Sequence, residues 1–381
     1  MKIILIGPTY PFRGGIAHYM TLLCQTLRQK HEVKFISFKR QYPKILFPGK
    51  SDRDPSHQPL KVDQVDYLLD PLNPWTWLRV TRTIKEYHPH LLVIPWWVSF
   101  WMPPFWFILK TLKGSSKTKT IFICHNVNEH ESNWLKKIAT KAVLSKADRL
   151  IAHSKEEMLR LKELLRRDFN GITAFLPTYA PLGVNRYTRE EAKQKLGLTG
   201  PVLLFFGFVR PYKGLNVLLD AMPLVLKEKE VTLLIVGEFW KDKEKYLRQI
   251  DIHRMGPKIK IVDDYVPNEE VGLYFAASDL VIQPYLSATG SAISQLAYGL
   301  DRPVIGTCVG GLPEIIEDGV NGWIVPPGDP ETLAKTILKS LEPEILKSLS
   351  QNASHTKEKF SWEKLGDILT GELKISEQES S

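Results

Sequence analysis

Short apolar runs alternate with amphipathic segments along nearly the whole chain, and this alternation limits the possible folds more than any other feature. Repeated strand–helix units predict parallel sheets covered by helices on both faces. The rhythm resets around residues 177–187, which predicts an α/β fold of two doubly wound, Rossmann-like domains facing across a cleft. The predicted strands are Lys2–Ile6, Val33–Phe38, Leu91–Ile94, Thr120–Cys124, Asp148–Ala152 and Thr173–Leu176 in the first domain, and Val202–Phe206, Thr232–Val236, Lys260–Val262, Leu280–Gln283, Pro303–Gly306 and Trp323–Val325 in the second.

The length of 381 residues is long for one hydrophobic core and suits two. We predict a first domain over residues 1–180 and a second over residues 181–359. Three widely separated cysteines, an odd number, indicate reduced thiols in a cytoplasm. Since the chain starts directly with a strand-like segment, we expect no secretory signal and a cytoplasmic location.

The net charge of +9 is unevenly distributed. Residues 1–185 hold 28 Lys and Arg against 14 Asp and Glu, and the remainder holds 23 against 28. A basic first half predicts a negatively charged partner, such as anionic lipid or a phosphorylated acceptor, although a merely solvated basic face has the same composition. Nucleic acid is not expected, because the aromatic residues are not interleaved with basic ones in any recognisable module.

The segment Leu91–Leu109 has 19 residues without a charge and by length could span a bilayer. Its three prolines argue against a continuous helix. We predict a strand, a tryptophan-rich turn and a helix begun by a proline pair. The side chains of Trp96, Trp97, Trp101 and Trp106 lie near several lysines, which suits either a membrane interface or core packing.

Two turns in the second half are suited to phosphate. After the run Leu280–Tyr285, a loop of small residues reaches Gly290 and a helix follows; free backbone N–H groups at a helix N-terminus can hold an anion. In the second turn, Arg210 and Lys213 follow a strand that ends at Gly207. Two cations there would stabilise a diphosphate and the charge that grows as it departs. The alternative is a solvated turn with two surface cations.

The first strand is followed by a glycine loop, Thr9–Gly15, at the end where open α/β sheets bind ligands. It is not a G-x-G-x-x-G fingerprint, so no nicotinamide cofactor is implied. Asp52-Arg53-Asp54 could be a metal-binding D-x-D, but no strand pattern flanks it. We therefore interpret this segment as part of a long loop over 39–59.

Several of these motifs together resemble a known family. LLFFGFVRPYKGLNVLLDA, PVIGTCVGGLPEIIEDGVNGWIVPPGD and GPTYPFRGGIAHYM are similar to segments of bacterial-type retaining glycosyltransferases of family 4, which have the GT-B fold. The resemblance covers nearly the whole chain in order. It implies that a C-terminal helix within residues 360–381 returns to complete the first domain.

The resemblance also implies roles for single residues. Lys213, with Arg210, would contact the donor's diphosphate, and His125 would lie near the transferred sugar. The other expected donor-binding residues are Gly14, Gly15, Gly207, Gly290, Ser291, Ser294 and Glu314.

The chain departs from the family pattern at three positions. Phe208 stands where many relatives have an arginine, so Arg210 would take over that work. A Glu-x7-Glu pair of the family is also absent, since its positions fall near Leu286 and at Ser294. These carboxylates usually bind a sugar hydroxyl and the donor ribose, so the sequence leaves the donor's identity open.

The expected function is hexosyl transfer from a nucleotide-diphosphate sugar to an acceptor hydroxyl, with retention of configuration. The family implies that the departing phosphate accepts the acceptor's proton, and that no metal or cofactor is required. A glycan or lipid-linked acceptor in cell-surface polysaccharide or glycolipid synthesis is expected, with peripheral attachment to the inner face of the plasma membrane. The alternatives are a GT-B protein that binds nucleotide sugars or glycans without transfer, and a nucleotide-sugar epimerase.

Overall fold

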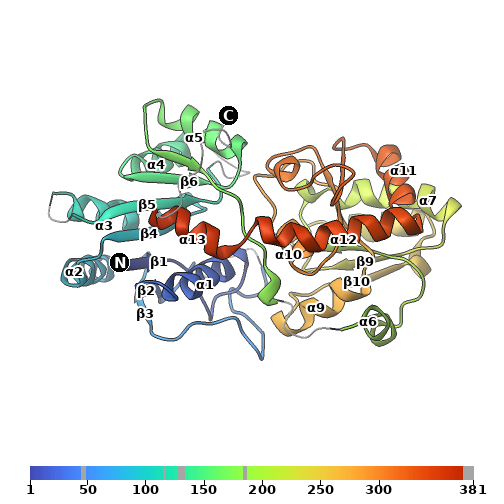
Figure 1. Ribbon diagram of the computed structural model, residues 1–381, viewed down its shortest axis with the longest axis horizontal. Helices are drawn as coiled ribbons and strands as arrows, with labels where there is room; N and C mark the ends of the chain where they lie inside the picture. Colours follow the sequence, from blue (N-terminus) through green and yellow to red (C-terminus); the bar gives the residue numbers. More distant parts are fainter. Residues whose placement is uncertain (44–48, 115–116, 128–133, 183–186, 372–381) are drawn as a thin grey trace. The chain divides into compact units, whose positions relative to one another are not determined.

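The computed structural model describes residues 1–43, 49–114, 117–127, 134–182 and 187–371 (Figure 1). The chain divides into two compact units. The first comprises Met1–Asp54, Leu60–Phe175 and Trp362–Ser381, and the second comprises Pro55–Pro59 and Leu176–Ser361. The sequence-based boundary was placed at residue 180, whereas the second unit's main segment begins at Leu176.

The first unit is built on a seven-stranded sheet with the strand order β3-β2-β1-β4-β5-β6-β7. All neighbouring strands pair in parallel. The strands are β1 (Lys2–Ile6), β2 (Glu32–Phe38), β3 (Val65–Leu69), β4 (Leu91–Trp96), β5 (Lys119–Cys124), β6 (Arg149–Ala152) and β7 (Gly171–Thr173). The strand order reverses between β1 and β4, and sheets of this kind bind ligands at the carboxyl ends beside such a reversal.

Helices pack on both faces of this sheet, because right-handed crossovers in opposite directions place them on opposite sides. On one face α1 (Gly15–Arg28) packs against α13 (Trp362–Thr370). The other face carries α2 (Pro74–Tyr87), α3 (Met102–Leu112), α4 (Trp134–Leu144) and α5 (Lys155–Leu165), each packed on the next (Figure 1). The last helix thus belongs to the first unit, as the resemblance implies, and Lys30 forms a 2.7 Å salt bridge to Asp367 of α13.

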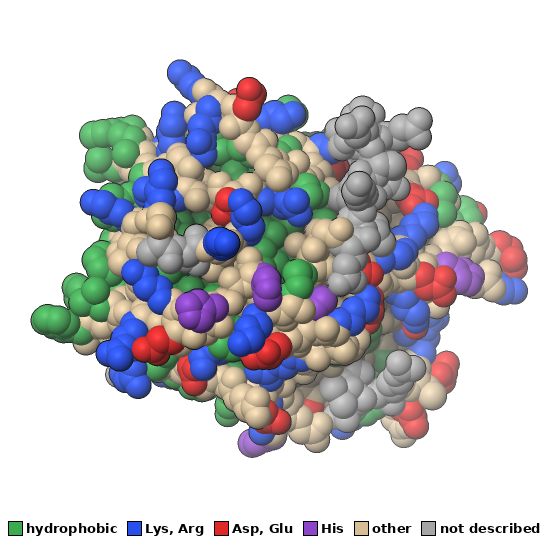
Figure 2. Space-filling view, turned by 60° about the vertical axis from the view of Figure 1, so that its left-hand side comes forward, with side chains coloured by type: hydrophobic (Ala, Val, Ile, Leu, Met, Phe, Trp, Pro, Cys, Tyr) green, Lys and Arg blue, Asp and Glu red, His purple; other side chains and the backbone are tan. Residues whose placement is uncertain are grey.

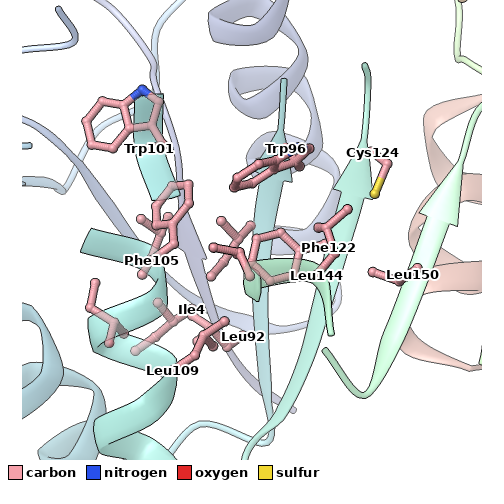
Figure 3. Packing of buried hydrophobic residues seen from close by; sticks show 14 of the residues in the cluster. Ile4, Leu92, Trp96, Trp101, Phe105, Leu109, Phe122, Cys124, Leu144 and Leu150 are labelled. Carbon is pink, nitrogen blue, oxygen red and sulfur yellow. The ribbon is translucent and has the colours of Figure 1, made fainter. Parts of the chain in front are cut away.

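Alternate residues of the strands point toward the layer formed by α2–α5 and build its core (Figure 3). Ile4, Leu92 and Phe122 of neighbouring strands are fully or almost fully buried together with Phe105 and Leu109 of α3. Since both faces of a parallel sheet are covered, such strands read as continuous apolar runs. This is why β1, β4 and β5 could be predicted from the sequence.

The tryptophan-rich segment lies mostly in this core. As predicted, a strand is followed by a turn and by a helix, α3, with the proline pair in its first turn. Trp96 and Trp101 are buried, and the Trp101 ring stacks on Phe38 with 4.0 Å between the ring centres. A membrane-interface position is therefore wrong for Trp96 and Trp101, while Trp97 and Trp106 are half-buried. Within the described ranges, no helix has the length and apolar character needed to cross a bilayer.

The second unit has a six-stranded sheet in the order β10-β9-β8-β11-β12-β13, again parallel throughout. Its strands are β8 (Val202–Phe206), β9 (Thr232–Val236), β10 (Ile259–Val262), β11 (Leu280–Gln283), β12 (Val304–Thr307) and β13 (Gly322–Val325). Its helices are α6 (Arg189–Leu196), α7 (Leu215–Glu228), α8 (Lys243–Ile252), α9 (Asn268–Ala277), α10 (Ala292–Gly299), α11 (Pro330–Ser340) and α12 (Pro343–Lys359). Here the strand order reverses between β8 and β11, which marks the expected ligand end of this sheet.

The segment predicted as a long loop folds back on the first glycine loop. Arg53 forms an antiparallel bridge with Phe12, and its guanidinium lies 4.8 Å from the centre of the Phe12 ring. The N–H of Asp54 donates to the carbonyl of Pro11 at 2.9 Å. Asp52 and Asp54 thus lie in a loop, and the described residues include no group of three His, Cys, Asp or Glu that could hold a metal ion.

Residues 55–59 of the same loop belong to the second unit, where they cap α9. The Ser56 hydroxyl accepts a hydrogen bond from the backbone N–H of Asn268 at 2.9 Å. The His57 N–H donates to the Glu269 carboxylate, also at 2.9 Å. Because the residue before α9 is a proline without a side-chain cap, Ser56 supplies the acceptor that a helix N-terminus requires.

Candidate functional site

The turn between β8 and α7 is held in place by two glycines. Gly207 follows β8 with φ +97°, and Gly214 directly precedes α7 with φ +67°, both in the region that favours glycine. A Cβ on Gly214 would lie 1.9 Å from the carbonyl oxygen of Pro284, so only glycine fits there. The Leu286 N–H donates to the Tyr212 carbonyl at 2.7 Å. The turn is therefore fastened to the carboxyl end of β11.

Lys213 lies in this turn as a buried cation. Its Nζ is 3.0 Å from the position that a Cβ on Gly207 would occupy and 5.6 Å from the centre of the Tyr285 ring. The residue is 8% exposed, and its side chain forms no hydrogen bond or salt bridge with any residue that the structure describes. Burial, aided by the nearby Arg210, lowers the pKa of Lys213 to about 8. A buried ammonium group without an acidic neighbour creates a place for an anion.

Arg210 stands beside a cluster of aromatic rings at the ends of three neighbouring strands. Its guanidinium lies 4.3 Å from the centre of the Trp240 ring. Phe208 packs against Trp240 and Tyr265, with ring centres 4.6 and 6.0 Å apart. All three rings are half-buried, so they offer a partly exposed apolar surface next to a cation. Our sequence reasoning missed Trp240 and Tyr265, although each follows the end of a strand, as Phe208 does.

The N-terminus of α10 lies next to Lys213. The Ser291 hydroxyl caps this helix by accepting from the backbone N–H groups of Ile293 and Ser294 at 3.2 and 3.3 Å. Tyr285, which neighbours Lys213, also hydrogen-bonds to Ser291. The Ile293 side chain would lie 3.4 Å from a Cβ on Gly207. The structure therefore brings Gly207, Lys213 and Ser291 together around one point.

Two further predicted donor-binding residues, Gly290 and Glu314, lie in the loops around this point. A Cβ on Gly290 would meet nothing within 4 Å, so the loop before α10 faces open space. Glu314 is exposed in a short 3-10 turn, Leu312–Glu314, after β12. The preceding Gly311 N–H donates to Thr289 at 3.1 Å, which ties this turn to the loop that contains Gly290.

Ser294 lies differently from the other predicted site residues. Its side chain is fully buried, and its hydroxyl donates to the Gln283 side chain at 2.7 Å. Its backbone N–H is already bonded to Ser291. In this conformation Ser294 offers a ligand no free group, and it joins α10 to β11 instead.

In the first unit, the glycine loop is open at the start of α1. Gly14, with φ +105°, is the residue before the helix, and Gly15 is the first helical residue. A Cβ on either glycine would meet no atom within 4 Å. The positive φ explains the glycine at position 14, and the open space leaves the backbone N–H groups of the first turn accessible.

His125 follows β5 and belongs to a cluster of rings. Its ring centre is 4.5 Å from that of Tyr19 and 5.2 Å from that of His153, and Tyr19 also packs on Trp362 at 5.0 Å. Burial and the neighbouring His153 hold the pKa of His125 well below its ordinary value. His125 is therefore neutral at physiological pH, and it can donate or accept a hydrogen bond but carries no charge.

His153 is a third residue of the site that was not predicted from the sequence. It follows β6 as His125 follows the adjacent β5, so its position after a predicted strand could have marked it. Its Nδ1 lies 3.1 Å from the carbonyl oxygen of Ala174, to which it donates, and burial lowers its pKa to about 4. The second nitrogen of this neutral ring, Nε2, is buried and finds no partner among the described residues.

Each of the two units contains a segment that matches a known protein family. Residues 13–172 match the family described as Glycosyltransferase Family 4, and residues 200–343 match the family described as Glycosyl transferases group 1. Apart from residues 55–59, the first match lies in the first unit, and the second match lies in the second unit. Each contains the glycine turn singled out above for that unit.

A curated relative and two solved structures are also similar to the chain. D-inositol 3-phosphate glycosyltransferase from Streptomyces bingchenggensis is 29% identical over 247 residues, which are 60% of this chain and 52% of that protein. The match thus spans about half the length of this curated relative. Sucrose-phosphate synthase from Thermosynechococcus elongatus is similar in structure, with a TM-score of 0.74 and 19% identity over 98% of both chains. HepE from Anabaena in complex with UDP has a TM-score of 0.75 and 18% identity over 98% of this chain and 99% of its own.

The structural similarity extends over both sheets, and it confirms the GT-B fold that was predicted from the alternation and the motifs. The family matches confirm the resemblance in the two halves separately. The chain therefore contains a Glycosyltransferase Family 4 domain and a Glycosyl transferases group 1 domain, and it has the GT-B fold.

Proposed function

We propose that this protein is a retaining glycosyltransferase that moves a sugar from a nucleotide-diphosphate donor to an acceptor hydroxyl. The observation that carries this proposal is the buried ammonium group of Lys213, which has no acidic partner in the described part of the chain and lies beside Gly207 and the capped start of α10. A diphosphate would supply the missing charge. The UDP bound to the structural relative HepE supports a nucleotide as the group that carries it.

In this proposal each unit has its own task. Lys213 and Arg210 neutralise the departing diphosphate, so the stabilisation they supply grows as the bond to the sugar breaks. The rings of Phe208, Trp240 and Tyr265 provide a surface on which a nucleobase can stack. The neutral His125 of the first unit hydrogen-bonds the transferred sugar, and Gly14 and Gly15 close over the diphosphate. Positioning and fixed charge then provide the catalysis.

The acceptor is proposed to be a glycan or a lipid-linked sugar in cell-surface polysaccharide or glycolipid synthesis, at the inner face of the plasma membrane. The excess of Lys and Arg in residues 1–185 supports this choice, because a basic surface concentrates acceptors that carry phosphate. Peripheral attachment is part of the same proposal.

The affinity for the donor should depend on pH through Lys213. Its pKa is about 8 in the free protein, and only the charged form attracts the diphosphate. We expect constant affinity below about pH 7 and a loss approaching tenfold per pH unit above about pH 8, because binding must then take up a proton. Calorimetric titration of a nucleotide sugar between about pH 7 and pH 9 measures this. The Lys213→Arg variant is the control, since an arginine stays charged and its affinity should stay level.

Thermal unfolding with a panel of UDP-, GDP- and ADP-sugars tests donor binding. A ligand at 100 times its Kd stabilises the folded protein by about 2.7 kcal/mol, so one base should raise the unfolding temperature clearly above the others. If no nucleotide sugar and no free nucleoside diphosphate shifted the transition, the donor site would be wrong.

A second candidate function is binding of nucleotide sugars or anionic glycans without transfer. The observation that favours it is Ser294, which stands at a family carboxylate position and is turned into the interior toward Gln283. Donor turnover separates the two functions, since a binding protein would hold the donor unchanged. A nucleotide-sugar epimerase would instead give a new nucleotide sugar in product analysis.

A further inference from the structure

Helix α4 carries apolar side chains on two opposite sides. The side that faces the sheet is buried and is formed by Thr140, Val143 and Leu144. The opposite side holds Trp134, Leu135 and Ile138, which are 68%, 56% and 57% exposed. A surface helix ordinarily presents polar residues to solvent, so three large apolar side chains on one outward face call for a partner.

The charge on the same helix limits the kind of partner. The sequence of α4, WLKKIATKAVL, contains three lysines and no acidic residue. Lys137 and Lys141 flank the outward apolar face, are exposed, and form no salt bridge to any residue in the described ranges. The exposed face of α4 is therefore both apolar and positively charged.

The neighbouring helices of the layer have the same character. On α3, Trp106 lies under two ammonium groups, those of Lys110 and Lys146, at 4.7 and 5.5 Å from its ring centre. On and beside α2, Trp75, Leu78 and Leu72 are exposed large apolar residues. Because α2 packs on α3 and α3 packs on α4, these features belong to one helix layer. Figure 2 brings this side of the first unit forward and shows Lys and Arg side chains spread among hydrophobic ones.

We propose that the outward face of this layer, centred on Trp134, Leu135 and Ile138, binds the surface of a bilayer that contains anionic lipid. Tryptophan favours the interface between headgroups and acyl chains, and leucine and isoleucine insert shallowly beside it. Lysines at the edges of such a face attract anionic headgroups while their stems lie along the apolar region. This surface gives the proposed membrane location a defined contact, and lipid binding itself requires no glycosyl transfer.

Charge also decides between a bilayer and a second copy of the chain. Two copies joined through this face would bring the unpaired lysines of both toward each other, which costs free energy, whereas an anionic bilayer neutralises them. The excess of 28 Lys and Arg over 14 Asp and Glu in residues 1–185 adds a long-range attraction of the same sign.

Co-sedimentation of the full chain with vesicles tests the proposal. Vesicles of phosphatidylglycerol mixed with phosphatidylcholine should bind the protein, those of phosphatidylcholine alone should bind it much less, and salt should weaken binding. The variant W134Q/L135Q/I138Q should lose affinity on the order of tenfold or more, because it removes the inserting side chains. The variant K137Q/K141Q should lose most of the preference for anionic vesicles.

The matched control is Ile252→Gln, which replaces an even more exposed apolar residue, 77% exposed, at the end of α8 in the second unit. It should bind vesicles like the wild type, and circular dichroism should show all variants folded. Equal binding by W134Q/L135Q/I138Q and the wild type would overturn the proposal, as would negligible binding of the wild type to both kinds of vesicle. A dimer in sedimentation velocity that this variant dissociates would also overturn it, because the face would then be covered by a second copy. These readouts involve no donor, so they succeed or fail independently of the transferase activity.

Discussion

The Lys213→Ala variant is expected to lose about 10²–10³ in turnover while keeping its fold. Lys213 is the buried cation that we assign to the diphosphate, and its charge is needed most when negative charge develops on the leaving group. Since the residue lies in a polar turn and has no salt-bridge partner among the described residues, its truncation breaks no ion pair. Steady-state donor consumption and thermal unfolding of the same preparation measure the two effects.

Removing a buried unpaired cation should leave the free protein equally stable or slightly more stable, because its desolvation cost disappears. The control is Lys245→Ala, which removes an exposed lysine from α8 in the same unit and should leave turnover unchanged. Near-native turnover of Lys213→Ala would show that the diphosphate is held elsewhere.

The His125→Ala variant is expected to lower the turnover of bound donor by about 10² while changing donor affinity little. His125 belongs to the first unit, whereas the cations and aromatic rings assigned to the nucleotide belong to the second. Its lowered pKa makes it a neutral hydrogen-bonding group, so His125→Gln should recover part of the activity. Calorimetric donor binding and single-turnover transfer separate affinity from chemistry.

The pH profile adds a second readout for His125. A catalytically required imidazolium would make activity rise as the pH falls through about 6.5, the ordinary histidine value. Because burial favours the neutral ring, we expect no such rise in the wild type. A large loss of donor affinity in His125→Ala, with normal turnover of the donor that still binds, would contradict its assignment to the sugar.

The sheets could be predicted largely because a buried parallel strand is apolar on both faces. The strands β1, β8, β9 and β11 begin and end where the sequence placed them. The strand β3 (Val65–Leu69) was missed, since it lies at the sheet edge, contains Asp66 and is mostly only half-buried. A strand was predicted over Thr173–Leu176, whereas β7 spans Gly171–Thr173. The apolar residues after Thr173 belong to the segment that leads into the second unit, which begins at Leu176.

The parts of the candidate site in which the functional residues follow adjacent strands could be predicted from the sequence. The parts in which tertiary packing sets the orientation of a side chain could not. Lys213 and Ser291 follow β8 and β11, two adjacent parallel strands, so their proximity follows from the topology. The inward turn of Ser294 depends on its hydrogen bond to Gln283, which helical spacing alone does not reveal. Trp240 and His153 have no motif of their own. Their only signal in the sequence is a position after a predicted strand, and the register of neighbouring strands then brings them next to Phe208 and His125.

Donor hydrolysis by the full chain without an acceptor distinguishes a transferase from a protein that only binds the donor. The protein would be incubated with the nucleotide sugar that stabilises it best, and release of nucleoside diphosphate would be followed for the wild type, Lys213→Ala and Lys245→Ala. The account predicts slow release by the wild type and by Lys245→Ala, a fall of about 10²–10³ in Lys213→Ala, and free sugar of retained configuration by NMR. Tight donor binding with no release above the uncatalysed rate would contradict the transferase function and favour a binding protein.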